Sequence, residues 1–127
     1  MTEDDSRLAD YLGHIVQAID RISRYVEDLT EPAFLTNELV QDAVIRNFEI
    51  IGEASRNIER RHPEFTAANP ELPLVAAYEM RNALSHGYFK VDLEIVWKTI
   101  QNDLPKLRDH VESIVRCLSD VDSSKIS

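Results

Sequence analysis

Apolar residues recur along most of this chain with spacings that alternate between three and four. Because an α-helix makes one turn every 3.6 residues, this spacing places them along one side of a helix. The first such stripe consists of Leu8, Leu12, Ile15, Ile19, Ile22, Val26 and Leu29. Similar stripes occupy residues 40–58 and 93–118. The sequence therefore predicts long helices that pack through narrow apolar faces.

Prolines and glycines mark where these helices are expected to end. The expected helices cover residues 8–29, 35–61, 74–85 and 92–118. We expect Pro32 to end the first helix, and His62-Pro63 to close the second. Pro105 lies inside the fourth helix, but the apolar stripe keeps its phase there, so one kinked helix is expected. The polar tail after Ser119 is expected to be frayed.

These helices predict an all-α fold in a single domain of 127 residues. Its expected form is an up-and-down antiparallel helical bundle of four main helices, the last kinked at Pro105. The helix over residues 35–61 carries additional apolar residues, so it is expected to be the most buried. These are Leu39, Ala43, Ile45 and Ile50. Trp97 fits the stripe of the fourth helix, which predicts a place in the core or at a dimer interface.

The composition narrows the class of function. A formal net charge of −9 argues against nonspecific nucleic-acid binding, although a local basic patch on an acidic protein remains compatible with it. The single cysteine, Cys117, allows no internal disulfide, which fits a reducing compartment. No signal peptide and no apolar run of about 20 residues is found, so we expect a cytoplasmic protein outside the membrane.

Polar residues crowd beside an apolar stripe in residues 80–88. On a helix, Asn82 and His86 lie one turn apart, and Asn82 can orient the imidazole or donate to a phosphate. His86 can exchange a proton near neutral pH, and Arg81 offers a planar fork that matches phosphate oxygens. RNA carries its own nucleophile, the 2′-hydroxyl, so this segment suits metal-independent cleavage of a phosphodiester.

The Arg-x4-His spacing by itself is a weak signal, because short motifs also arise by chance. In the structural interpretation, Arg81 pairs with Glu79 or Glu53, and His86 is a cation at a helix C-terminus. The same interpretation makes Tyr88 a core aromatic. From the spacing alone, this structural interpretation is the favoured one.

Two other clusters of charged residues are possible sites. Glu49 and Glu53 are four residues apart, like a helical pair of metal ligands, but a di-iron bundle needs paired Glu-x-x-His motifs and only Glu59-x-x-His62 is present. No metal or cofactor is therefore expected. Three arginines end the second helix: Arg56, Arg60 and Arg61. Their favoured role is to complement the helix dipole, and the alternative is contact with RNA phosphates.

The wider sequence resembles the HepT-like toxins of the HEPN superfamily. Three runs carry the resemblance in order over residues 8–118. They are Phe48-Glu49-Ile50-Ile51-Gly52-Glu53-Ala54, then Met80-Arg81-Asn82-Ala83-Leu84-Ser85-His86-Gly87-Tyr88, then residues 91–97 with Asp103-Leu104-Pro105. The Arg-x4-His-x-Tyr element becomes specific when the Ile-Gly-Glu-Ala run precedes it. This chain shows no departure at the motif positions.

The resemblance implies a homodimer in which the motifs of two protomers face one shared cleft. It implies a metal-independent endoribonuclease with Arg81 and His86 as catalytic residues and Asn82 in support. It also implies an antitoxin partner, a MntA-type nucleotidyltransferase that adds AMP to Tyr88. An AMP group there would place bulk and negative charge beside Arg81.

A second function, of a different class, remains open at this point. The chain could be a non-catalytic helical module that docks the nucleotidyltransferase and binds nucleotide or RNA without cutting it. Arg81 and His86 would then only contact phosphate. The same pair of residues suits both roles, so the sequence does not separate them.

Overall fold

The computed structural model describes residues 3–72 and 93–126, with side chains described in 7–72 and 93–118. Every regular element in these stretches is helical, which confirms the all-α prediction. The elements are α1 (Glu3–Val26), α2 (Glu31–Leu35), α3 (Glu38–Arg61), α4 (Pro63–Ala68), α6 (Leu93–Lys98), the π-helical turn η1 (Thr99–Asp103) and α7 (Leu104–Ile126). The expected helix over residues 74–85 lies outside the described residues, so the four-helix bundle stays a prediction.

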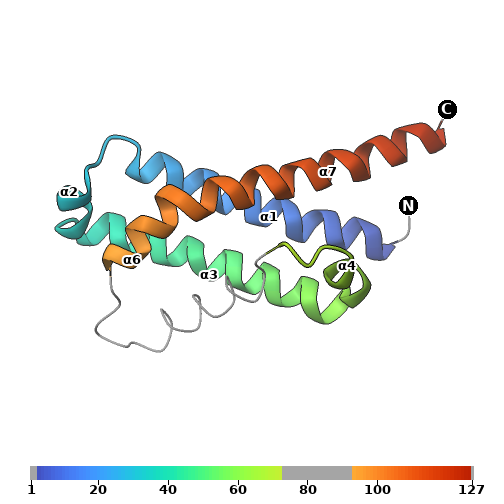
Figure 1. Cartoon of the computed structure of the whole chain (residues 1–127), viewed down its shortest axis with the longest axis horizontal. Helices are drawn as coiled ribbons and strands as arrows, with labels where there is room; N and C mark the ends of the chain where they lie inside the picture. Colours follow the sequence, from blue (N-terminus) through green and yellow to red (C-terminus); the bar gives the residue numbers. More distant parts are fainter. Residues whose placement is uncertain (1–2, 73–92, 127) are drawn as a thin grey trace.

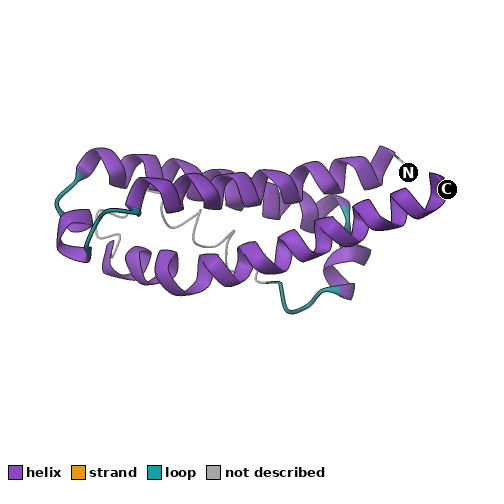
Figure 2. Cartoon of the chain, turned by 90° about the horizontal axis from the view of Figure 1, so that it is seen from above, coloured by secondary structure: helices purple, strands orange, loops and turns teal. Residues whose placement is uncertain are grey.

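Three long helices lie side by side and give the molecule its elongated shape (Figures 1 and 2). Helix α1 contacts both α3 and α7. It runs antiparallel to each of them, as Figure 1 shows from the course of the chain. The short helix α2 sits at one end, where it contacts α3 and α6. Burial of the apolar stripes explains this arrangement, because each stripe needs a neighbouring helix to cover it.

The predicted stripe of α1 forms the centre of the core. Its members are buried from Leu8 to Val26, and three of them have an exposed fraction of zero: Leu12, Ile15 and Ile22. Burying an aliphatic side chain of this size contributes about 1.5–3 kcal/mol to folding. The opposite face of α1 keeps charged residues in solvent, as expected for an amphipathic helix. No helix among the described residues is long and apolar enough to cross a membrane.

Helix α3 buries the stripe that the sequence predicted, and Ile45 and Ile50 widen it as partly buried residues packed against the core. Val44, Ile51 and Ile58 are fully buried or nearly so. Leu39, which was expected to widen the buried face, is 81% exposed, so this part of the prediction is wrong. Val40, the next residue in the same turn, packs against the core, so the buried face of this turn is that of Val40 and not that of Leu39. Asn37 caps that turn by accepting a hydrogen bond from the Val40 N–H at 3.1 Å.

Two prolines begin helices where the sequence analysis placed ends or connections. Helix α1 stops at Val26, and Pro32 lies in the first turn of α2 behind the N-cap Thr30. Pro63 likewise opens α4, in a stretch expected to be an irregular connection. Both departures have the same cause. A first-turn residue donates no hydrogen bond within its helix, so proline costs little there, and its fixed φ suits a helix.

The C-terminal part of the chain is helical throughout, with α6, η1 and α7 following one another without a loop. This confirms the prediction that the helix continues past Pro105. In the π turn, the Leu104 N–H bonds to the Thr99 carbonyl, five residues back. The wider turn lies directly before Pro105, which has no N–H of its own to donate; a kink at this proline stays a prediction. The helix persists to Ile126, although a frayed tail was expected after Ser119.

Trp97, which belongs to the apolar stripe of the expected fourth helix, lies in α6 and faces the core. The ring of Trp97 in α6 packs against Phe34 of α2, with ring centroids 5.4 Å apart. Phe34 is completely buried, and Trp97 lies against the core cluster. Trp97 therefore packs against the core while remaining partly exposed, and the dimer-interface alternative stays a prediction. This contact ties the short helix α2 to the C-terminal part of the chain.

Candidate functional site

The four residues that the sequence singled out lie outside the described residues. Arg81, Asn82, His86 and Tyr88 all fall in residues 73–92. Their catalytic, supporting and modified roles stay predictions. The structure does describe α3, which carries the Ile50-Ile51-Gly52-Glu53-Ala54 run that accompanies the motif in the resemblance.

This run separates small buried residues from an exposed carboxylate. Gly52 and Ala54 are buried, whereas Glu53 between them is exposed. The separation follows from the helical turn of about 100° per residue, which points neighbouring side chains in different directions. Glu53 and Arg56 both have interaction partners, so neither is an isolated charge. The expected pairing of Glu53 with Arg81 stays a prediction.

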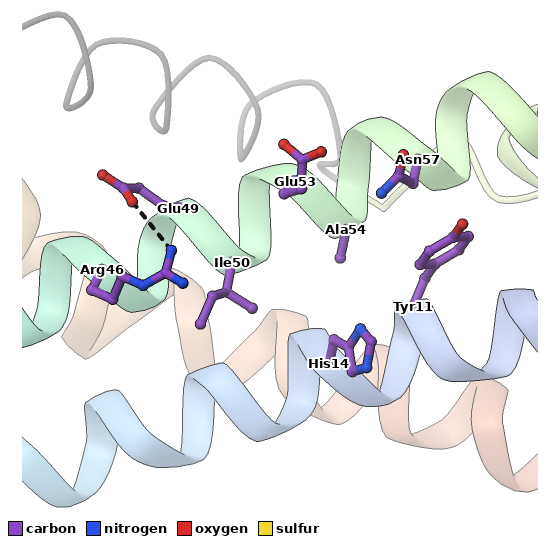
Figure 3. A pocket seen from close by; sticks show the side chains of 8 residues that line it. All are labelled: Tyr11, His14, Arg46, Glu49, Ile50, Glu53, Ala54 and Asn57. Carbon is purple, nitrogen blue, oxygen red and sulfur yellow. Dashed lines mark hydrogen bonds and ion pairs between the residues drawn. The ribbon is translucent and has the colours of Figure 1, made fainter.

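A pocket of about 470 Å³ lies between α1 and α3, and Glu53 forms part of its wall. Helix α1 contributes Tyr11 and His14, which are three residues apart and share a face. Helix α3 lines the other side with residues at the same kind of spacing. Its polar members there are Arg46, Glu49, Glu53 and Asn57. Figure 3 shows Tyr11 and Asn57 at one end, and Arg46 and Glu49 at the other.

The charges in this pocket do not favour a phosphate. Arg46 donates to a Glu49 carboxylate oxygen at 3.4 Å, and Glu53 adds a second carboxylate. The Arg46 and Glu49 side chains are 70% and 34% exposed, so water screens this ion pair and weakens it. Arg46 already donates to Glu49, so the arginine of this lining is not an unpaired cation that could hold an anion. The pocket is a mixed polar groove, suited to hydrogen bonding more than to holding RNA.

Tyr11 and His62 close one end of this region. Their rings meet edge to face, with centroids 6.2 Å apart and an interplanar angle of 66°. The Nε2 atom of His62 is buried and has no hydrogen-bond partner among the described residues. His62 caps the C-terminus of α3 through its backbone N–H, which donates to the Ile58 carbonyl at 2.8 Å. The His62 ring therefore contributes to packing, as expected for a residue that closes a helix.

Sequence reasoning did not single out the α1 side of this pocket. Tyr11 and His14 lie next to the apolar stripe of α1, and their three-residue spacing was the available signal. That signal could not say which helix faces them, because α1 contacts both α3 and α7. Among the described residues, no group of three or more His, Cys, Asp or Glu side chains could hold a metal ion. Arg60 and Arg61 lie in the last turn of α3, where their charges complement the helix dipole.

Comparison with known proteins covers most of the chain, including the motif. A family model described as "Ribonuclease HepT-like" matches residues 15–114. That range contains Arg81, Asn82, His86 and Tyr88. No solved structure shows a significant match to the chain.

Two relatives illustrate the extent of the similarity. "Probable ribonuclease HepT" of Thermococcus cleftensis is 40% identical over 105 residues, which cover 83% of this chain and 93% of that protein. "Gamma-glutamylcyclotransferase and putative RNase" of Methanocaldococcus jannaschii is 40% identical over 115 residues, covering 91% of this chain. The match spans only 49% of the latter protein, so this chain corresponds to about half of it. The chain belongs to the HepT-like ribonuclease family.

Proposed function

We propose that this chain is the toxin of a toxin–antitoxin pair and acts as an endoribonuclease that needs no metal ion. The observation that carries the proposal is the family match over residues 15–114, which spans the complete Arg-x4-His-x-Tyr motif. The 40% identity to a relative named as a probable ribonuclease supports it over nearly the same length. The all-helical fold agrees with the bundle that the family resemblance implies.

The proposed reaction uses a nucleophile that the RNA itself supplies. His86 accepts the proton of a 2′-hydroxyl, and the 2′-oxygen attacks the adjacent phosphorus. The bond between phosphorus and the 5′-oxygen breaks, and that oxygen leaves with a proton. The products are a 2′,3′-cyclic phosphate and a 5′-hydroxyl. Arg81 places its guanidinium against the phosphate oxygens, where negative charge builds up in the transition state.

A homodimer would complete this site. Two copies of the motif facing one cleft would provide one histidine to accept the first proton and a second to donate to the leaving oxygen. Asn82 supports the site by holding the imidazole of His86 or by donating to a phosphate. The cleft between two protomers would also be wider than a site built from one Arg81 and one His86, which suits an RNA strand.

Control of the activity is proposed to act through Tyr88. A MntA-type nucleotidyltransferase would transfer AMP from ATP to the Tyr88 hydroxyl, two residues beyond His86. The Tyr88 oxygen, having lost its proton, would bond to the α-phosphorus of ATP, and pyrophosphate would leave. The added phosphodiester carries negative charge, and it would compete for Arg81 with the RNA phosphate that Arg81 otherwise binds. The bulk of the adenosine would also block the cleft.

The decisive experiment is a cleavage assay with purified protein and a defined RNA in the presence of EDTA. We expect cleavage to continue, with fragments that end in a 2′,3′-cyclic phosphate and begin with a 5′-hydroxyl. An otherwise identical substrate with 2′-deoxyribose at the cleaved positions should resist, because it lacks the nucleophile. Binding of RNA without any cleavage would instead support the non-catalytic binding module. Cleavage that disappears with EDTA and returns with a divalent cation would contradict the proposed chemistry.

A further inference from the structure

A second groove, separate from the α1/α3 pocket, lies between α1 and α7 and has a volume of about 380 Å³. Its α1 wall runs from Gly13 to Arg24, with lining residues three or four apart on one helical face. At a rise of 1.5 Å per residue, this wall is about 16 Å long. A Cβ atom built on Gly13 would meet no atom within 4 Å outside its own turn of helix, so this end of the groove is open.

The carboxylates in this groove are already occupied by arginine. Asp20 on α1 uses both of its oxygens on Arg108 of α7, at 2.6 Å and 3.4 Å. Glu112 binds Arg108 through one oxygen and Arg116 through the other. All four carboxylate oxygens of Asp20 and Glu112 are thereby engaged, and Arg108 is held firmly in the wall.

Arg21 and Arg24 contribute positive charge that no ion pair with a described residue neutralises. Both line the groove. Among the described residues, neither has an ion-pair or hydrogen-bond partner. The arginines of the groove and its rim therefore outnumber the carboxylates, and they still do when Asp109, 4.0 Å from Arg108, is counted. A positive groove on a chain of net charge −9 is a local feature that the overall charge conceals.

The chemistry of the lining favours a phosphate backbone over a protein partner. Guanidinium groups match phosphate oxygens with two parallel hydrogen bonds. The core of a protein interface is usually built on aromatic or large aliphatic anchors. The apolar residues in this lining are only Val16 and Val115. The groove is long, open and arginine-rich, which suits an extended strand more than a protein side-chain anchor.

We propose that the α1/α7 groove binds the sugar–phosphate backbone of the RNA substrate, with Arg21 and Arg24 contacting its phosphates. This inference rests on the proposed function, since it assumes that RNA is the substrate. The Asp20–Arg108–Glu112 network fixes the opposite wall, so the groove is already formed before RNA arrives. Such contacts hold a strand without reading its sequence.

The test compares two double variants with the same change in charge. Arg21→Gln/Arg24→Gln removes the groove cations, and Lys98→Gln/Lys106→Gln removes two exposed lysines that line neither pocket. Each is made in a His86→Ala background so that RNA is bound and not cut. The affinity for a fluorescent single-stranded RNA of about 20 nucleotides is measured over a range of salt concentrations. Each phosphate contact to a single strand contributes about 0.7 to the slope of log affinity against log salt concentration.

We expect the groove variant to lose roughly 1.4 from that slope and to bind about tenfold more weakly at low salt. The lysine control should keep the slope and affinity of its parent. Arg21→Lys/Arg24→Lys retains the charges and should restore the slope. Arg21 and Arg24 have no partners among the described residues, so circular dichroism and the unfolding temperature should stay unchanged.

Three results would overturn the inference. The groove variant could bind RNA with an unchanged slope, or both double variants could weaken binding equally. The groove variant could also bind RNA normally and lose its dimer or its nucleotidyltransferase, which would assign the groove to a protein partner. The two proposals can fail separately. RNA binding through the groove without cleavage by the wild-type chain would remove only the ribonuclease proposal, and cleavage with no effect of Arg21 or Arg24 would remove only this one.

Discussion

Arg108 on α7 forms a two-pronged ion pair with Asp20 on α1, with Nε–Oδ1 and NH2–Oδ2 distances of 2.6 Å and 3.4 Å. The hydrogen bond to Asp20 and its negative charge raise the pKa of Arg108 further above its usual range, and Glu112 adds to this. The two residues are 88 positions apart in the chain, so the pair joins the first helix to the last. The ion pair adds a polar contact to the apolar packing between α1 and α7.

The first prediction concerns the strength of this pair. Asp20→Ala, Arg108→Ala and the double variant form a double-mutant cycle, measured by urea unfolding. The side chains of Arg108 and Asp20 are 34% and 45% exposed, so water screens much of their attraction. We expect a coupling energy of about 0.5–1 kcal/mol, which falls at high salt. A coupling near zero at low salt would mean that the pair does not stabilise the α1–α7 contact.

The second prediction concerns the start of α3. Asn37→Ala removes the side chain that accepts the Val40 N–H at 3.1 Å, and should lower the free energy of unfolding by about 1 kcal/mol. Thr30→Ala is the matched control. Thr30 caps the five-residue helix α2 through a longer contact of 3.4 Å, so it should cost less. Equal losses for both variants in thermal or urea unfolding would show that the caps do not differ as their geometry indicates.

The helices of this protein could be predicted from the sequence because their apolar stripes are regular. Leu12 and Ile15 are completely buried on the face that the three-and-four spacing assigned to them. The close of α3 at His62 was also predictable, because a proline follows. Local signals of this kind depend only on neighbours in the chain.

Features that depend on contacts between distant segments could not be predicted. The apolar pattern did not indicate that Asp20 would pair with Arg108, or that Tyr11 and His14 would line a pocket with α3. Pro32 was expected only to end the first helix. A proline is found after one helix and also in the first turn of the next, so its position in the sequence does not separate the two roles. The exposure of Leu39 could not be predicted either. A periodic pattern assigns a residue to one face of a helix, but it does not show which other segments cover that face. The motif residues themselves were identified by resemblance to a family and lie outside the described part.

The third prediction concerns catalysis. Arg81→Ala and His86→Ala should each lower the rate of RNA cleavage by at least about 100-fold, because each removes a group that acts on the transition state. The unfolding temperature should change little. His14→Ala is the control, since His14 is an exposed histidine in the α1/α3 pocket and outside the motif. Full activity in the His86→Ala protein, or an equal loss in the His14→Ala protein, would refute the catalytic assignment.

The fourth prediction concerns assembly. We expect sedimentation equilibrium at micromolar concentration to give about twice the chain mass of 14.6 kDa. A mixture of Arg81→Ala and His86→Ala proteins provides a sharper test. If one cleft draws on both protomers, a heterodimer of the two inactive variants retains a partial set of groups and can recover some activity. A monomer that cleaves RNA with full activity would contradict the shared cleft.

The last prediction concerns how the activity is switched off. Tyr88→Phe removes only the hydroxyl that would accept AMP, so the fold and most of the ribonuclease activity should be retained. Coexpression of the wild-type chain with its nucleotidyltransferase should add the mass of one AMP to a peptide containing Tyr88, and RNA cleavage should cease. The Tyr88→Phe protein should remain unmodified and toxic under the same conditions. Tyr78→Phe is the matched control, since it removes a hydroxyl from the same part of the sequence and outside the motif.

The physical reason for inhibition can be tested separately. If AMP acts by competing for Arg81, the modified protein should bind RNA more weakly than the unmodified protein. This loss of affinity should be smaller when Arg81 is already alanine. Modification at another residue, or neutralisation of Tyr88→Phe by AMP transfer, would exclude this mechanism and leave the ribonuclease proposal intact.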